Sequence, residues 1–216
     1  NFTTNNAKVV IGIALSLVVL SYVGISKLTV ENRFIDYFKS STEIYKGMEL
    51  LDQKLGGTAP LDIVLNAPND WSVEEEEFDD DFGFEENADS MNGYWWNTIS
   101  ISRLEEVHDY IESLPEIGKV LSVASGIKVA RELNDGEELS ELDLALVKNM
   151  LPEDIKESLL SSYISEDENQ VRISARVLES SYGLNRNELL EEISTTLEKE
   201  YGFSDQEYRL TGLAVL

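Results

Sequence analysis

The stretch from Val9 to Ile25 reads VVIGIALSLVVLSYVGI and decides how the chain is organised. It holds seventeen residues without a charge, and Lys8 and Lys27 stand on its two sides. At the rise of an α-helix, this run is just long enough to cross a bilayer core of roughly 30 Å. We therefore predict a transmembrane helix within residues 1–28, with the rest of the chain on one side of a membrane.

Two other interpretations of this run remain open. A cleaved signal peptide has an apolar stretch of about 7–15 residues and a small-residue cleavage site, but this run is longer and Tyr22 to Ser26 offers no such site. A helix buried in a soluble domain usually has a polar face, yet Ser16 and Ser21 are the only hydroxyl residues before Tyr22. The basic residue Lys8 favours an N-terminus in the cytoplasm, which would place the acidic remainder in the periplasm.

The strongly negative net charge of the chain argues against two kinds of binding partner. Its 216 residues include 17 Lys and Arg against 42 Asp and Glu, for a formal net charge of -25. Such a charge argues against binding nucleic acid and against a basic patch that holds the chain to anionic lipids. The absence of cysteine excludes disulfides and thiolate metal sites. No phosphate-binding or dinucleotide-binding fingerprint occurs, so the sequence indicates no cofactor.

Residues 29–60 form a linker and a connecting helix. The linker is rich in aromatic residues, and Ser40 with Glu43 predicts a capping box that opens the helix. Apolar residues then recur at helical spacing, namely Ile44, Met48, Leu51 and Leu55. Gly56 and Gly57 are expected to end the helix, because glycine accepts the left-handed conformation of a C-cap.

Residues 61–212 predict one α+β domain. Four segments read as strands: Leu61–Leu65, Val120–Val123, Val171–Val177 and Tyr208–Gly212. Two helices are predicted between them, from Ser102 (with Glu105 in a capping box) to Leu114 and from Asn187 to Tyr201, and residues 127–165 form a helical insert broken at Asn134–Gly136 and Pro152. Two β-α-β units in this order build a ferredoxin-like sheet, four-stranded and antiparallel, backed by helices.

Two segments depart from this plan. Residues 69–93 form an acidic, low-complexity insert that we predict to be a mobile loop. Its acids from Glu74 to Asp81 could bind a hard cation such as Ca²⁺, but they do not match EF-hand spacing, and a solvated loop is the better interpretation. Residues 213–216 turn apolar, which indicates the start of a second membrane segment, with a buried terminal strand as the alternative.

Few residues suggest chemistry. The single histidine, His108, is predicted at the edge of a helical apolar stripe, without convergent partners for catalysis or metal binding. No nucleophile-elbow motif accompanies it, so we predict that the chain is not an enzyme. Trp95 and Trp96 could line an apolar substrate path or lie at the membrane interface, and packing in the core is at least as good an interpretation.

Three stretches together resemble a known family. The first, Leu51 to Ile63, reads Leu-Asp-x-x-Leu-Gly-Gly-Thr-x-Pro-Leu-Asp-Ile; the others are Leu-Pro-x-Ile-Gly-x-Val-x-Ser-Val from Leu114 to Val123 and Thr-Gly-Leu-Ala from Thr211 to Ala214. With the preceding apolar helix, they resemble the first periplasmic loop of RND-superfamily exporters of the MMPL-like or hydrophobe/amphiphile efflux type. The most specific stretch contains the structural motif residues Gly56, Gly57, Thr58, Pro60 and Asp62.

The resemblance implies a function. Such exporters move lipidic, hydrophobic or amphiphilic molecules out of the inner membrane, driven by protons that pass through acids in later membrane helices. This chain would be the first transmembrane helix and first periplasmic porter domain. The bilayer, such substrates, the remainder of the transporter and further copies in a homo-oligomer would be its partners. The alternative is a complete single-pass, membrane-tethered sensor or adaptor domain, and a membrane-anchored hydrolase ranks last.

Overall fold

A computed structural model describes residues 7–26, 33–68, 93–150 and 161–215, and the chain divides into two units, Asn1–Asn32 and Arg33–Leu216. The described residues of the first unit form one helix, α2 (Ala7–Ser26). Its window from Lys8 to Ile25 is long and apolar enough to cross a membrane, and none of that window is buried. The helix is therefore consistent with a membrane anchor or a signal sequence.

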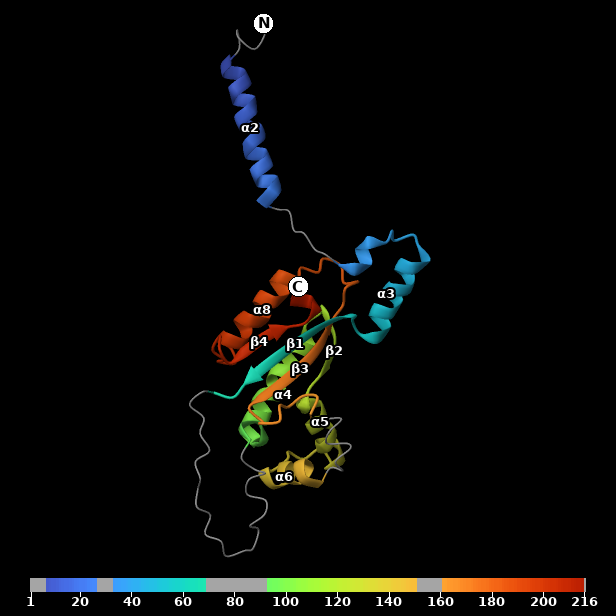
Figure 1. Ribbon diagram of the computed structural model, residues 1–216, viewed down its shortest axis with the longest axis vertical. Coiled ribbons are helices and arrows are strands. Elements are labelled where there is room, and N and C mark those ends of the chain that lie inside the picture. Colours follow the sequence, from blue (N-terminus) through green and yellow to red (C-terminus); the bar gives the residue numbers. More distant parts are fainter. Residues whose placement is uncertain (1–6, 27–32, 69–92, 151–160, 216) are drawn as a thin grey trace, which may run out of the picture. The chain divides into compact units, whose positions relative to one another are not determined.

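The second unit is an α+β domain built on a four-stranded antiparallel sheet (Figure 1). The strands are β1 (Ala59–Asn66), β2 (Ile117–Leu121), β3 (Gln170–Val177) and β4 (Tyr208–Thr211). Their order across the sheet is β2-β3-β1-β4, so β3 lies between β1 and β2, and β1 lies between β3 and β4. The predicted α+β class and four-stranded antiparallel sheet are confirmed.

Alternation along the central strands separates a buried face of the sheet from an open one. Leu61 pairs with Ala175 and Ile63 with Ile173 across β1 and β3, and all four side chains are fully buried. Side chains at even spacing therefore share one face. The core lies between that face and helices α4 (Thr98–Ser113), α5 (Val123–Leu133) and α8 (Arg186–Lys199).

Five further elements complete the part of the chain that the structure describes. They are the helices α3 (Glu43–Leu55) and α6 (Glu141–Met150), and the 3-10 turns η1 (Phe34–Tyr37), η3 (Tyr94–Trp96) and η4 (Leu213–Val215). The helical insert thus begins at Val123 and includes α5 and α6, with the predicted break at Asn134–Gly136, where Gly136 has a φ of 83°. Pro152 and residues 69–92, which hold nearly all of the acidic insert and its proposed cation ligands, lie outside the described residues.

Both predicted capping boxes are wrong, since each helix begins elsewhere. Thr42, not Ser40, caps α3, because its hydroxyl accepts a hydrogen bond from the Tyr45 amide at 3.3 Å. Asn97 caps α4 by accepting from the Ser100 amide at 2.8 Å, five residues before the predicted cap at Ser102. In both cases a second residue that can cap a helix lies nearby in the sequence. The observed caps, Thr42 and Asn97, lie in the segments that lead from η1 into α3 and from η3 into α4.

The strand predicted at Val120–Val123 is displaced as well. The sheet pairing ends at Leu121. Ser122 instead caps α5, because its hydroxyl accepts from the Ala124 amide at 3.1 Å and the Ser125 hydroxyl accepts from the Ser122 amide at 3.2 Å. A capping box that the sequence analysis did not predict therefore lies at the end of this apolar run.

The two possible caps of α4 provide a direct test. Asn97→Ala is expected to lower the free energy of unfolding by about 1 kcal/mol, because it removes the acceptor for the Ser100 amide. Ser102→Ala, at the predicted cap, is expected to change it by less than about 0.5 kcal/mol, since this residue is exposed within the helix. Urea unfolding of the two variants measures the difference. An equal loss in both would contradict the observed start of α4.

Three of the four residues of the apolar stripe predicted on α3 face outward, and the fourth, Met48, is half-buried. Ile44, Leu51 and Leu55 are 57%, 54% and 51% exposed, and Asp52 is the one residue of this helix that is buried. The spacing of the stripe identified the helix correctly, but spacing alone does not say what covers the stripe.

The last described residues lie against the core. Ala214 in η4 is buried there, and the second membrane segment expected from residue 213 remains a prediction.

Candidate functional site

The predicted motif after α3 makes a close contact between segments that are far apart in the sequence. Gly56 is the left-handed C-cap of α3, with a φ of 70°. A Cβ placed on Gly118, in β2, would lie 2.5 Å from the Gly56 carbonyl oxygen and 2.7 Å from the Gly56 Cα. Only a residue without a side chain fits there, because such distances lie far inside van der Waals contact. The first two resembling stretches therefore touch through their glycines.

The next glycine joins α3 to β3. Gly57 has a φ of 98°, and a Cβ at this position would lie 2.8 Å from the backbone carbonyls of Arg176 and Val177. The amide of Thr58 then donates to the Val177 carbonyl at 3.2 Å, which starts the pairing of β1 with β3. The chain turns from helix to central strand within two residues, and only glycine allows that turn.

A buried carboxylate fastens the same turn. Asp52 is 1% exposed and accepts hydrogen bonds from the Thr58 hydroxyl at 2.6 Å and from the Ser180 amide at 2.8 Å. Burial raises its pKa, but the hydrogen bonds from Thr58, Ser180 and Glu179 outweigh that effect and hold its pKa below the ordinary value of 3.8. The ionised carboxylate thus links the last turn of α3 to the loop after β3.

The third resembling stretch reaches the same end of the sheet. A Cβ on Gly212, directly after β4, would lie 2.5 Å from the carbonyl oxygen of Pro60 in β1. We call this end the sheet-end junction, and define it by the residues Asp52, Gly56, Gly57, Thr58, Gly118, Ser180 and Gly212. All of these residues except Ser180 lie in the three stretches that resemble the exporter family, and each stretch contributes at least one.

The start of the domain is held at this junction too. The Arg33 guanidinium donates to the backbone carbonyls of Glu179 at 3.3 Å and Ser181 at 3.2 Å, and to the Asp36 carboxylate at 2.7 Å. The Glu179 side chain is buried and accepts from Arg186 at 2.5 Å. The first described residue after the apolar helix is therefore tied to the same loop that Asp52 holds.

The predicted motif residues do not all meet. Gly56, Gly57 and Thr58 lie in the junction, and the Pro60 backbone contacts it. Asp62 is half-buried on the open face of the sheet, opposite Ser174 and Thr211. Sequence reasoning missed Ser180 and Arg33, for which no local pattern gives a signal. Asp52 and Gly118 stood inside the quoted stretches without an assigned role.

The two candidate substrate-path aromatics belong to the core. Trp95 is fully buried, and its indole N–H donates to the Asn169 carbonyl at 3.3 Å. Trp96 is buried beneath Lys148, whose ammonium lies 5.5 Å from the centre of its ring. A cavity of about 190 Å³ opens between α4, α5 and α6, and neither tryptophan lines it. A role of these rings in a substrate path remains a prediction.

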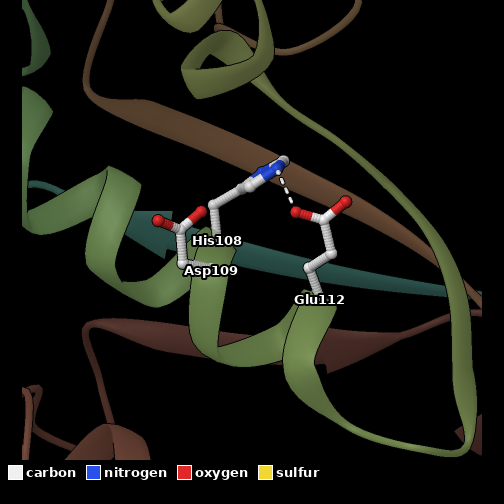
Figure 2. A group of neighbouring side chains, drawn as sticks. All are labelled: His108, Asp109 and Glu112. Atoms are coloured by element: carbon white, nitrogen blue, oxygen red, sulfur yellow. Dashed lines mark ion pairs between the residues drawn. The ribbon is translucent and has the colours of Figure 1, made fainter.

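The histidine that seemed isolated in the sequence has close partners. His108 is 3% exposed, and its Nδ1 lies 2.9 Å from the Ser122 hydroxyl. Its Nε2 lies 3.9 Å from the Glu112 carboxylate, and Figure 2 shows this contact beside Asp109. The Ser122 oxygen also accepts the Ala124 amide at 3.1 Å, so this hydroxyl joins His108 on α4 to the first turn of α5.

The side chains around His108 offer ligand atoms for a metal cation, but a lysine ammonium already lies among them. His108, Asp109 and Glu112 present atoms within 4.8 Å of one another. The Lys128 ammonium bonds to Asp109 and lies 3.9 Å from Glu112, so it supplies the positive charge that a metal would bring. Ser122 resembles an activated nucleophile only in its distance to the imidazole. It is buried and engaged as a helix cap, which assigns the pair to packing α5 against α4.

The His108 contacts predict a pH effect on stability. Burial and the nearby Lys128 lower the His108 pKa below 6.5, against the opposing effect of Glu112, Asp109 and Glu105. The unfolded chain therefore takes up this proton first as the pH falls, so the His108 contribution to stability is present above pH 6.5 and is lost below it. We expect the urea concentration at the midpoint of unfolding to decrease when the pH is lowered from 7 to 5. The decrease should be larger in the parent chain than in the His108→Leu variant. Equal slopes would contradict the buried, neutral imidazole.

Comparison with known proteins gives no relative from which these sites could be interpreted. No protein-family model matches the chain, and no curated protein matches it.

Proposed function

We propose that the chain is the first transmembrane helix and first periplasmic porter domain of a proton-driven RND-type exporter in the inner membrane. One observation carries the proposal. The three stretches that resemble this family converge on the sheet-end junction, although they lie around residues 56, 118 and 212. The substrates would be lipidic, hydrophobic or amphiphilic molecules.

The strand order supports a porter domain of the ferredoxin-like type. Two β-α-β units that interleave their strands give the order β2-β3-β1-β4, which is the order in this domain. Porter domains of this kind would move as units when an exporter alternates between open and closed states. The close glycine contacts and the buried Asp52 suit such a role, because they leave little room for bending where the chain enters the domain.

Proton coupling would have to use residues outside this chain's apolar helix. The run from Val9 to Ile25 contains no ionisable side chain except Tyr22, and ionisable residues at the centre of membrane helices are what proton relays require. The chain would thus provide the substrate side of the transporter, in contact with its remaining domains and with other copies in a homo-oligomer.

Export of an amphiphile tests this proposal. Cells that lack the gene are expected to retain more of a fluorescent amphiphilic dye than the parent cells, and the native gene is expected to restore the difference. A protonophore should abolish that difference, because proton flow drives the transport. Equal retention of cationic, anionic and neutral amphiphiles with and without the gene would contradict export.

The second candidate is a single-pass sensor or adaptor domain, tethered by the same helix. A compact α+β domain with its own core would also suit this role. Stable co-purification with a separate membrane protein, together with unchanged dye retention in cells without the gene, would favour this candidate over the exporter.

A further inference from the structure

The first part of the domain exposes an unusual number of large apolar side chains. Six of them lie between residues 34 and 55: Phe34, Tyr37, Ile44, Leu50, Leu51 and Leu55, each more than half exposed. Two neighbouring loops at the sheet-end junction expose more, namely Tyr182 next to Ser181, and Leu213 and Val215 after Gly212. Large apolar side chains that are concentrated and exposed in one segment are typical of a site that binds a protein or a membrane.

The orientation of α3 keeps its stripe outward. Asp52 is hydrogen bonded inside the junction, and Gly56 packs directly on Gly118. These contacts fix the rotation of the helix about its axis. Leu51 and Leu55 therefore cannot turn into the domain core without breaking the buried carboxylate contacts.

This segment is also electrically neutral in a strongly acidic chain. Residues 33–55 hold four basic residues (Arg33, Lys39, Lys46 and Lys54) and four acidic ones (Asp36, Glu43, Glu49 and Asp52), against a net charge of -25 for the whole chain. An approach of this segment to phosphate headgroups therefore meets little repulsion, whereas most other parts of the surface would be repelled.

Chain length places the segment near a bilayer if α2 spans one. Only six residues separate Ser26, the end of α2, from Arg33. Seven residue-to-residue steps reach at most about 25 Å, even when fully extended. Tyrosine residues such as Tyr37 are typical of the membrane–water interface, and amphipathic helices lie there with their apolar face toward the acyl chains.

We propose that η1 and α3 lie in the headgroup region of the phospholipid bilayer that anchors α2, with Ile44, Leu51 and Leu55 directed toward the acyl chains. This proposal rests on one part of the proposed function, the membrane anchor, and does not depend on export. The partner is the lipid itself, because the covalent link to α2 holds this surface close to the membrane in every copy of the chain.

Depth-dependent fluorescence quenching tests the proposal on the full chain. The chain has no cysteine, so a single introduced cysteine carries one NBD fluorophore. Leu51→Cys and Leu55→Cys place it on the stripe, while Gln53→Cys on the other side of α3 and Glu191→Cys on α8 are exposed controls. Leu17→Cys in α2 reports on the anchor. Each variant is reconstituted in phosphatidylcholine vesicles with and without a nitroxide-labelled lipid.

We expect blue-shifted emission and loss of fluorescence to the nitroxide lipid at residues 51, 55 and 17, and neither effect at 53 or 191. Quenching at 17 without quenching at 51 and 55 would overturn the placement of α3 while leaving the anchor intact. A blue shift at 51 and 55 without quenching would overturn it too, because a second copy or another protein segment would then cover the stripe.

The two possible failures are distinguishable. An unquenched label at residue 17 would show that α2 does not enter the bilayer, which overturns the anchor and the placement of α3 together. If the Leu51→Cys variant fails to fold, as judged by its near-UV circular dichroism, Ile44→Cys at the other end of the stripe gives the same test.

Discussion

Replacing Gly118 with alanine is expected to lower the free energy of unfolding by about 3 kcal/mol, the upper end of the usual cost of overpacking. The added methyl group would meet the Gly56 carbonyl oxygen at 2.5 Å and the Gly56 Cα at 2.7 Å. Both are backbone atoms, so no side chain can rotate away to make room. Overpacking that forces a backbone shift has this order of cost. Urea unfolding of the detergent-solubilised chain, followed by tryptophan fluorescence, gives the value.

Gly126→Ala is the matched control. Gly126 lies within α5, and a Cβ at this position would meet nothing within 4 Å. Alanine is the better helix former, so this variant is expected to be more stable by about 0.5–1 kcal/mol. If both alanine variants unfold at the same urea concentration, the close contact between α3 and β2 is not present in solution.

Replacing Asp52 with asparagine is expected to destabilise the domain by about 2 kcal/mol at pH 7. The carboxylate accepts from both Thr58 and Ser180, and an amide can accept with only one of its two terminal atoms. One buried donor would then face an N–H group. Loss of a hydrogen bond to a buried charged group has about this magnitude.

The pH dependence of the same variant gives an independent check. The Asp52 pKa is held below 3.8 in the folded chain, so its contribution is fully present above the unfolded value and is lost as the pH falls through the lower folded value. The parent chain should therefore lose more stability than Asp52→Asn as the pH falls below about 4. Thr58→Val, which keeps the carboxylate but removes one of the hydrogen bonds that lower its pKa, should lose part of that acid sensitivity. A parent chain and an Asp52→Asn variant with identical acid profiles would contradict an ionised Asp52 in the junction.

Local patterns predicted most of the fold because they depend on local physics. Alternation of buried and exposed residues identified β1 and β3, although β1 begins two residues before the predicted start. The left-handed stop at Gly56 was expected from glycine's conformational freedom, and it is confirmed. The starts of α3 and α4 were wrong because several residues near each start can cap a helix, and the approach of the preceding chain decides among them.

The sheet-end junction could be predicted only in part. The sequence indicated that Gly56, Gly57 and Thr58 matter, but Gly118 is a neighbour of Gly56 only after the sheet has formed. Asp52 sits beside an apolar stripe, and nothing local indicates that the carboxylate points inward while Leu51 points outward. Contacts between residues more than a hundred positions apart, such as Asp52 with Ser180, follow from strand order and leave no mark in a local pattern.

The apparent size of the native protein in isolated, carbonate-washed membranes tests the exporter proposal most directly. An antibody against residues 161–177 would detect it on an immunoblot. We predict a membrane-retained band several times larger than the 24.3 kDa of this chain, as a polytopic exporter requires. A band at or just below 24.3 kDa would contradict the exporter and would leave a tethered or secreted single domain.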